Sequence, residues 1–398
     1  MESVESVKQE DQNVTPWAAT CGANGFQYDR LIEKFGVDKI DQTLIDRFEA
    51  VTGKPVHPWI KRGIFFAHRE FNSILDDYEQ GKPIFLYTGR GPTTEALHLG
   101  HMIPFIFTKW LQDVFDAYLV IQMADDEKFF FKDMPFDEVY RLGFENAKDI
   151  IACGFNPDKT FIFSNRDYMV TPCAHNLVHE MMNVVNMNTI QQIFGLPNNG
   201  SIGQFVWPIY QSAAAFSKFF EPIFGKGVNV RCLVAYAIDQ DPYFRLCRDL
   251  APRLGQFKPA SIITQFLPAL EGKAKMSSTS NNGQVSRTIF MTDDPKSIET
   301  IIKRYAQSGG KDTLEEHRKL GGDLDKDMSF QYLRYFEFDD DILEEIARDY
   351  RSGKMLSGEI KMILANKLIE LVTRHQEARN TITEEQLKYF YDISKFNK

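Results

Sequence analysis

The 398-residue sequence has few cysteines, no long apolar run and no excess of positive charge, and each absence excludes a class of protein. Its five cysteines form no CxxC pair, so they indicate neither a disulfide framework nor a sulfur-rich zinc site. No apolar stretch approaches the roughly 20 residues of a membrane helix, so no membrane partner is expected. The polar, acidic residues 1–13 lack the basic start and apolar run of a secretory signal, which favours a disordered N-terminus and a cytoplasmic protein.

The net charge of −9 argues against sequence-independent binding of nucleic acid, which needs a broad basic face. An RNA partner would have to be held by a local patch. His175 and His179 lie one helical turn apart and precede Glu180, but the spacing of a zinc protease is absent. We interpret these histidines as surface or packing residues and expect no structural metal.

Short apolar runs alternate with longer helical stretches along the first three quarters of the chain. With 43% hydrophobic residues the chain can bury a large core. Most of the runs are apolar on both faces, as parallel strands covered by helices are. They lie at residues 83–87, 117–122, 160–163, 230–236 and 261–266. This order predicts an α/β protein with an open, Rossmann-like parallel sheet.

Four segments follow from this pattern. The interval between the third and fourth runs is too long for one crossover, so residues around 166–225 are interpreted as a helical insertion in a catalytic domain at 81–285. From about residue 290 amphipathic helical patterns replace strands, which predicts an all-helical domain at 286–398. Residues 14–80 carry aromatic and apolar clusters and are expected to form a folded N-terminal appendage.

A glycine-rich loop follows the first strand and leads into His98-Leu-Gly-His101, which opens a helix. A strand, a loop and a helix start form an anion-binding arrangement, because free N–H groups and the helix dipole face the bound group. The loop contains no GxxxxGK[ST], and Gly89-Arg-Gly91 does not continue to GxGxxG. Gly100 would let a purine approach the backbone, and the two histidines would donate to phosphate oxygens.

A second group lies in a polar loop after the last strand, where KMSST occupies residues 275–279. A lysine beside two serines is common in solvated loops. Combined with HxGH at the other end of one parallel sheet, it becomes much more specific.

With these two motifs the sequence resembles the class I aminoacyl-tRNA synthetases, whose signatures are HIGH and KMSKS, and more closely their eukaryotic tryptophanyl type. The resemblance covers the chain from about residue 14 to the C-terminus. It is carried by YTGRGP at 87–92, QMADDEK at 122–128, KDIIACG at 148–154, AIDQDPYFR at 237–245, SGGKDT at 308–313 and EEHR at 315–318. It implies tryptophan activation with Mg-ATP, tRNA(Trp) as the acceptor, a helical anticodon-binding domain, a homodimer and no structural zinc.

The resemblance also implies roles for individual residues. Charge stabilisation would fall to His98, His101 and Lys275, assisted by Ser277 and Ser278. The ATP site would comprise Arg90, His98, Leu99, Gly100, His101, Lys275, Met276, Ser277 and Ser278. The second lysine of KMSKS is missing here, so Lys275 would make the phosphate contact of the loop alone, and any role of Lys273 is in doubt. Residues 14–17 look like the segment that folds over the ATP site.

The tryptophan pocket can also be reasoned from chemistry. Indole offers one N–H donor and a large apolar face, so its site needs one or two acceptors in an apolar box. By the resemblance Tyr87 and Gln122 meet the indole nitrogen, while Glu127, Gln211 and Gln240 hold the α-amino and carboxylate groups. All five are expected at or near the carboxyl ends of strands or in the insertion, where open α/β sheets bind ligands.

Three alternatives remain beside this interpretation. A tyrosine-specific synthetase would typically place an Asp three residues after the pocket glutamine, but Gln211 is followed by Ser-Ala-Ala at 212–214. A dinucleotide-dependent oxidoreductase would need the glycine fingerprint, and a non-catalytic signalling fragment would not need both signatures.

Lys311 and Asp312 are candidate anticodon readers, and their alternative role is that of a solvated loop before a helix.

Overall fold

A seven-stranded sheet forms the centre of this computed structural model, which describes residues 12–17, 19–21, 25–272, 275–276 and 287–396. The strands lie in the order β3-β4-β9-β8-β5-β6-β7. Their bounds are β3 (Asp38–Lys39), β4 (Phe65–Arg69), β5 (Ile84–Arg90), β6 (Tyr118–Met123), β7 (Thr160–Ser164), β8 (Arg231–Ala237) and β9 (Ala260–Thr264). A separate antiparallel pair is formed by β1 (Asn13–Val14) and β2 (Ala19–Thr20).

The five parallel strands are those that the apolar runs predict, and the α/β fold class is confirmed. The chain runs outward from β5 to β6 and β7, then returns to the other side of β5 for β8 and β9. The strand order therefore reverses between β5 and β8. In open parallel sheets a ligand binds outside the carboxyl ends of the strands at such a reversal.

The antiparallel edge of the sheet was not expected from the sequence. Strand β4 pairs with β9, and β3 pairs with β4, both in antiparallel register. Residues 65–69 belong to the segment interpreted as an N-terminal appendage, yet they extend the central sheet. The run is apolar and buried, with Phe65 and Ala67 fully covered, so it has the signature of a core strand.

Successive residues of each strand point to opposite faces, and two core clusters result. Ile84 and Leu86 of β5 join one cluster. Phe85 and Tyr87 join the other, which also contains the insertion helices. The helices before the insertion are α1 (Tyr28–Phe35), α2 (Gln42–Thr52), α3 (Pro58–Lys61), α4 (Phe71–Glu79), α5 (Leu99–Phe115), α6 (Glu127–Lys132) and α7 (Phe136–Ile151).

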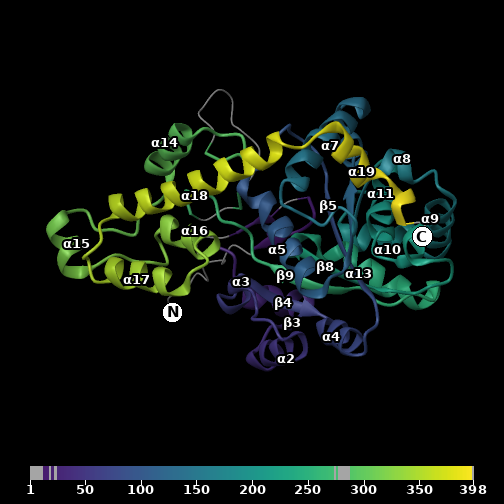
Figure 1. The fold of residues 1–398 in the computed structure, drawn as a ribbon, viewed down its shortest axis with the longest axis horizontal. Helices are drawn as coiled ribbons and strands as arrows, with labels where there is room; N and C mark the ends of the chain where they lie inside the picture. The colour runs from purple at the N-terminus through teal and green to yellow at the C-terminus, as the bar shows by residue number, and fades with distance from the viewer. Residues whose placement is uncertain (1–11, 18, 22–24, 273–274, 277–286, 397–398) are drawn as a thin grey trace, which may run out of the picture.

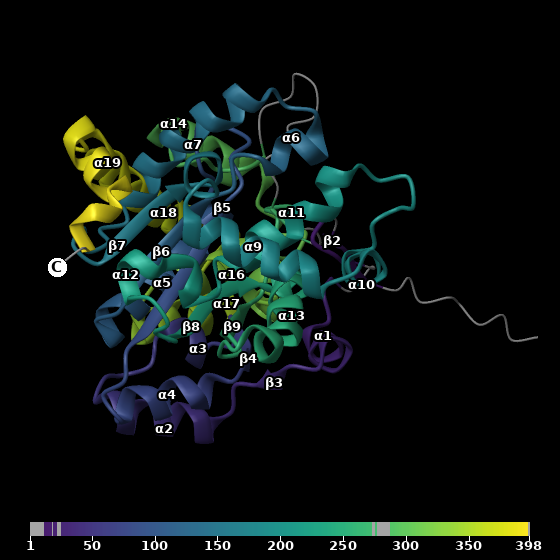
Figure 2. The ribbon, with the colours of Figure 1, turned by 90° about the vertical axis from the view of Figure 1, so that its right-hand side faces the viewer.

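The insertion is helical, as the sequence predicts. It comprises α8 (Asn165–Tyr168), α9 (Pro172–Val184), α10 (Met187–Phe194), α11 (Ile202–Ala213), η1 (Ser217–Phe220) and α12 (Glu221–Phe224). Between β8 and β9 the chain forms η2 (Ile238–Gln240), α13 (Asp241–Leu250) and η3 (Ala251–Leu254). Figure 2 shows α9, α10, α11 and α13 gathered on the same side of the molecule.

Residues 287–396 carry helices and no strand. They are α14 (Pro295–Tyr305), α15 (Leu314–Leu320), α16 (Met328–Phe336), α17 (Asp340–Arg351), α18 (Ser357–Asn380), α19 (Glu384–Tyr391) and η4 (Ile393–Phe396). In Figure 1, α15, α16 and α17 form a lobe at one end, and α18 runs from it towards α7. Helix α19 then packs beside β7, where Lys395 Nζ donates to the Thr160 carbonyl at 2.8 Å.

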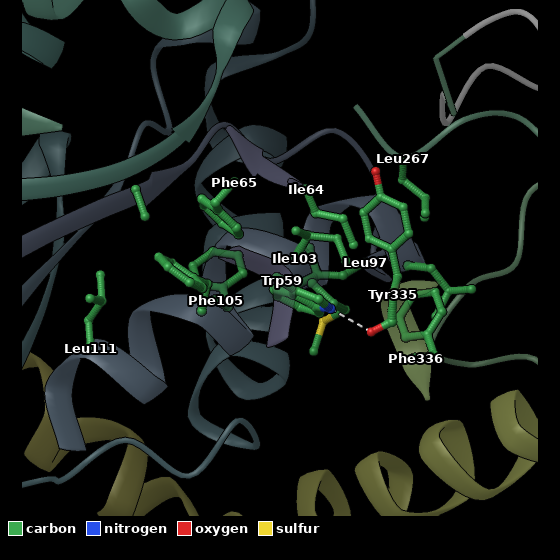
Figure 3. Close-up of a cluster of buried hydrophobic side chains, with 14 of the residues drawn as sticks. Trp59, Ile64, Phe65, Leu97, Ile103, Phe105, Leu111, Leu267, Tyr335 and Phe336 are labelled. Carbon is green, nitrogen blue, oxygen red and sulfur yellow. Dashed lines mark hydrogen bonds between the residues drawn. The ribbon is translucent and has the colours of Figure 1, made fainter. Parts of the chain in front are cut away.

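The helical lobe is joined to the sheet by a buried aromatic cluster (Figure 3). Trp59 of α3 is fully covered, and its Nε1 donates to the carbonyl oxygen of Tyr335 in α16 at 2.6 Å. Phe65 of β4 stacks on Phe107 of α5, with ring centroids 3.6 Å apart. A continuous core thus holds the C-terminal helices against the sheet. No described helix has the length and apolarity needed to span a bilayer.

Candidate active site

A cavity of about 620 Å³ opens at the carboxyl ends of β5 and β8, where the strand order reverses. The start of α5, the ends of β6 and β9, the N-terminal segment and the loop after β9 complete its wall. Eleven of the residues that the sequence predicts for the site line it: Tyr87, Arg90, His98, Gly100, His101, Gln122, Glu127, Gln211, Gln240, Lys275 and Met276. Residues from both halves of the chain therefore meet in one place.

Leu99, one of the residues predicted for the ATP site, does not line the cavity. Leu99 is fully buried in the core, and its backbone N–H donates to the Ile289 carbonyl at 3.1 Å, so neither group faces the cavity. A residue at the first position of a helix can point its side chain inward, which the motif alone does not reveal. Ser277 and Ser278 lie outside the described residues.

The HxGH turn brings two imidazoles together at the N-terminus of α5. His98 precedes the helix and stacks on His101 with ring centroids 3.4 Å apart. A Cβ atom at Gly100 would lie 3.1 Å from His98 Cε1, so the glycine leaves this side of the turn open. His98 Nδ1 is buried and has no hydrogen-bond partner within the described part of the chain, which suits a site for a polar ligand.

Burial keeps both imidazoles uncharged. Burial, together with the positive charges of Arg90 and Lys275, lowers the pKa of His98 to about 3. Burial and the same cations hold the pKa of His101 well below 6.5. At neutral pH the histidines can form hydrogen bonds but carry no positive charge. A share of His98 and His101 in charge stabilisation would therefore come through hydrogen bonds and not through a charge on the imidazole.

Arg90, at the end of β5, is one of the cations in the cavity. Burial lowers its pKa to about 10, partly offset by Glu127 and Asp149, so it remains charged at neutral pH. Its Nε donates to Asn146 Oδ1 at 3.0 Å, and its Nη1 lies 2.9 Å from His101 Nε2. A guanidinium can only donate, so this contact requires the tautomer of His101 in which Nε2 is the acceptor, whereas the contact of the His98 backbone N–H with His101 Nδ1 at 3.3 Å requires the other tautomer.

Lys275 is a second cation, and it is not free in its loop. Its Nζ lies 2.5 Å from Asp239 Oδ2 and 4.7 Å from the ring centroid of Phe266. Asp239 follows β8 in η2 and is almost fully buried. The sequence analysis missed Asp239 as a partner of Lys275, although both lie in segments that carry the resemblance.

The other end of the cavity holds the predicted indole acceptors. Tyr87 Oη donates to Gln122 Oε1 at 2.5 Å and lies 3.0 Å from the Gln211 carbonyl oxygen. Burial raises the pKa of Tyr87 well above 10, so its hydroxyl stays protonated. Aromatic side chains of Tyr243 and Phe244 also line the cavity. The combination is an apolar box with two oxygen atoms as acceptors.

The remaining pocket residues are held in pairs. Gln211 Nε2 donates to Gln240 Oε1 at 3.1 Å. Lys128 Nζ donates to Glu127 Oε1 at 2.6 Å. A Cβ atom at Gly91 would lie 1.8 Å from Glu127 Oε2, so only glycine at this position lets the carboxylate reach the end of β5.

The N-terminal segment takes part in the wall through Pro16, Trp17 and Ala19. Trp17 Nε1 donates to the Phe194 carbonyl at 2.8 Å, and its ring stacks on Phe131 with centroids 4.1 Å apart. These contacts fix the segment against the insertion and α6. Away from the cavity, the rings of His175 and His179 are tilted against each other with centroids 4.1 Å apart, and among the described residues no group of three potential metal ligands is found.

A Rossmann-like sheet with an HxGH turn and a lysine-bearing loop at the strand reversal is the arrangement of a class I synthetase. A family model described as tRNA synthetases class I (W and Y) matches residues 79–373. The chain belongs to this family.

Of the two kinds of enzyme in this family, for tryptophan and for tyrosine, the similar proteins are the tryptophan enzymes. The cytoplasmic tryptophan–tRNA ligase of Oryctolagus cuniculus is 50% identical, covering 97% of this chain and 81% of the relative. That of Homo sapiens is 49% identical, covering 97% and 82%. The structure of Plasmodium falciparum tryptophanyl-tRNA synthetase matches with a TM-score of 0.85 at 43% identity, covering 93% and 98%. An Encephalitozoon cuniculi tryptophanyl-tRNA synthetase bound to tryptophan matches with a TM-score of 0.84 at 40% identity, covering 93% and 99%.

Proposed function

We infer that this protein is a tryptophan–tRNA ligase, which activates L-tryptophan with ATP and transfers it to tRNA(Trp). The observation that carries the inference is one cavity with acceptors at one end and cations at the other. Tyr87 and Gln122 suit a single indole N–H in an aromatic box, whereas Arg90 and Lys275 suit phosphates. The Oryctolagus cuniculus and Homo sapiens relatives are named cytoplasmic tryptophan–tRNA ligases, which supports the same substrate and location here.

Tyrosine fits the cavity less well. A tyrosine site must pair the phenol hydroxyl, and a built partner for it discriminates strongly. Among the described residues, the acidic side chains lining the cavity are Glu127 and Asp239, and each is paired with a lysine, Lys128 and Lys275 respectively. No acid follows Gln211 at 212–214. The tyrosine-specific alternative is therefore not favoured.

The reaction has two steps, with ATP entering as its Mg²⁺ complex. The tryptophan carboxylate attacks the α-phosphorus, pyrophosphate leaves and tryptophanyl-adenylate forms. The terminal ribose hydroxyl of the tRNA then takes the acyl group and releases AMP. Neither step needs a protein nucleophile, so the residues of the cavity act by positioning and by stabilising charge.

At the phosphate end, Arg90 and Lys275 supply the positive charge. His98 and His101 contribute neutral hydrogen-bonding groups and, with Gly100, shape the turn against which the nucleotide lies. Met276, Ser277 and Ser278 are assigned to the same site by the resemblance of KMSST to KMSKS. Leu99 is left out because its side chain and its N–H are both engaged in the core.

At the amino-acid end, Glu127 faces the α-amino group and Gln211 with Gln240 faces the carboxylate. The Gln211–Gln240 bond supports this, because it holds two amides at fixed positions on the wall. A carboxylate such as Glu127 is the natural partner of an ammonium group, and Gly91 gives it room.

The N-terminal segment closes the cavity. Trp17 packs against residues of α6 and α10, so it ties residues that line the cavity to the insertion. Deletion of residues 1–11, which keeps the two hydrogen bonds between Gln12 and Gln27, is expected to be harmless. Deletion through Gly25 should raise the ATP requirement or abolish activation, measured by ATP–pyrophosphate exchange. Full activity of the longer deletion would mean that the segment only packs.

The C-terminal helices read the anticodon, and the active form is a homodimer. Lys311 and Asp312 are exposed and precede α15 in the chain. Figure 1 shows α15 at the outer end of the helical lobe. Domain boundaries at 81–285 and 286–398 fit these roles, while residues 14–80 form an appendage whose strand β4 belongs to the sheet. Light scattering should give about twice the chain mass of 45.9 kDa, whereas a mass of one chain would exclude the dimer.

The substrate is tested by ATP–pyrophosphate exchange with tryptophan, tyrosine and phenylalanine in parallel. Exchange should depend on tryptophan, with the other two amino acids near background. Exchange with tyrosine at a rate comparable to that with tryptophan would overturn the assignment. Charging of tRNA(Trp) with labelled tryptophan then tests the second step.

A further inference from the structure

Behind the proposed indole acceptor lies a row of buried polar side chains that the sequence analysis did not single out. Gln122 Nε2 donates to Asn165 Oδ1 at 2.7 Å and to the Tyr210 carbonyl at 3.2 Å. Asn165 Nδ2 donates to Asp126 Oδ1 at 2.9 Å, and Trp207 Nε1 donates to the same oxygen at 2.9 Å. The side chains of Gln122, Asn165, Asp126 and Trp207 are all buried, so these bonds are shielded from water.

The row has a direction that chemistry fixes. An indole N–H can only donate, so Trp207 requires the Asp126 oxygen to be an acceptor. Asn165 must then turn its NH₂ group towards Asp126 and its oxygen towards Gln122. Gln122 in turn directs its NH₂ group inward, to Asn165 and the Tyr210 carbonyl, and its oxygen towards the cavity.

This direction matters because a side-chain amide has two orientations of nearly equal shape. In the observed one Gln122 presents an oxygen, which can accept from the N–H of a substrate. In the flipped one it would present NH₂, and two donors would face each other. A buried donor left without a partner weakens binding by about tenfold or more.

We propose that Asn165, oriented by Asp126 and Trp207, is a positioning residue that keeps the oxygen of Gln122 towards the substrate and so sets the preference for a ring bearing an N–H group. The inference rests on the proposed function, in which Tyr87 and Gln122 meet the indole nitrogen. Asn165 touches no substrate. It is the first residue of α8, directly after β7, and it reaches the site only through Gln122.

The test compares L-tryptophan with β-(benzothiophen-3-yl)-L-alanine, in which sulfur replaces the N–H at almost unchanged shape. For each substrate kcat/KM is measured by ATP–pyrophosphate exchange in the full chain and its variants. In Asn165→Leu the preference for tryptophan should fall about tenfold, mainly through a higher KM, because the shorter of the two bonds that hold the amide nitrogen inward is lost and only that to the Tyr210 carbonyl remains. The analogue should change by less than about threefold, since it has no donor to lose.

Two further variants sharpen the comparison. Asn165→Asp keeps an oxygen facing Gln122 and can share a proton with Asp126, so the preference should be retained. Gln112→Leu is the matched control, because Gln112 is another buried amide, bonded to Thr160 Oγ1 at 3.0 Å and outside the cavity wall. It should lower the thermal midpoint without altering the ratio of the two substrates.

The inference is overturned if Asn165→Leu lowers kcat/KM for both substrates by the same factor, or leaves their ratio at the wild-type value. Either result would make Asn165 a structural residue only. If Asn165→Leu does not fold, Asn165→Ser is measured in its place against the same criterion. Failure of the proposed function is seen separately, because the unaltered chain would then show no tryptophan-dependent exchange.

Discussion

Lys275 gives the sharpest test of the proposed phosphate site. In the structure it is paired with Asp239, whereas in the proposed reaction it contacts the pyrophosphate. Its Nζ lies 2.5 Å from Asp239 Oδ2, and it reaches the cavity from the loop after β9. During adenylate formation negative charge shifts onto the departing pyrophosphate. A contact that strengthens only at this stage lowers the barrier without tightening ground-state binding.

Lys275→Ala should therefore slow adenylate formation by on the order of 10² to 10³, as the loss of one preorganised donor does elsewhere. Tryptophan affinity should barely change, because Tyr87 and Gln122 lie at the other end of the cavity. The Lys275 side chain is 40% exposed but that of Asp239 only 6%, so the variant also leaves a buried carboxylate without its cation, and its thermal midpoint is measured alongside the rate. Rapid-quench measurement of a single turnover, with a tryptophan titration, separates the two quantities.

Two variants show whether the missing cation itself causes the slower rate. Removing Lys275 leaves the buried Asp239 carboxylate unpaired, so Lys275→Ala is also combined with Asp239→Asn. A double variant that regains the rate would place the defect in that unpaired charge rather than in a missing cation. Lys218→Ala removes a lysine of similar exposure, 32% against 40%, which is paired with Glu180 in the insertion, and should leave the rate unchanged. A normal adenylation rate at saturation, with tryptophan binding lost, would refute the reasoning.

Three other predictions concern separate parts of the molecule. Gln122→Ala should weaken tryptophan activation by about 1 to 3 kcal/mol, seen as a higher KM in pyrophosphate exchange. Unchanged kinetics would remove Gln122 from the indole site. Lys311→Ala with Asp312→Ala should spare adenylate formation and slow charging. Equal charging of wild-type tRNA and an anticodon mutant by the unaltered enzyme would contradict anticodon reading altogether. Burial lowers the pKa of both His57 and His98 to about 3 in the folded chain. Below about pH 6.5 the unfolded chain therefore binds more protons at these two histidines than the folded chain does. The free energy of unfolding should thus fall between about pH 6.5 and 3, with a shallower slope in His57→Gln; an equal slope in that variant would exclude His57 as a source.

The sheet was predictable where the sequence shows the signature of a doubly covered strand. Each of the five parallel strands is an apolar run bounded by polar residues, and each forms within a few residues of its expected bounds. Strand β4 has the same signature, but it precedes the first nucleotide-fold strand and pairs antiparallel with β9. Nothing local distinguishes such an edge strand from a packed appendage, because its partner lies about 200 residues later in the chain.

The site was predictable to the extent that its residues lie in recognisable motifs. Those motifs locate His98, Lys275 and the indole acceptors, but they do not show what each side chain bonds to. Asp239 and Asn165 act through partners that are brought close by the order of strands β8, β5, β6 and β7. Their roles depend on distances across the sheet, so no spacing along the sequence could have indicated them.

The positive groups around the cavity support the proposal that this acidic chain binds a polyphosphate. Arg90 ends β5, whereas Lys275 enters from the loop after β9 and pairs with Asp239, which follows β8. Arg90 is held by the neutral amide of Asn146 and Lys275 by the buried carboxylate of Asp239. The two histidines stay neutral because burial, together with both cations, lowers their pKa values. Lys128 and Lys132 lie in the same wall, so the net charge of −9 is compatible with the proposed nucleotide site, where positive side chains gather locally.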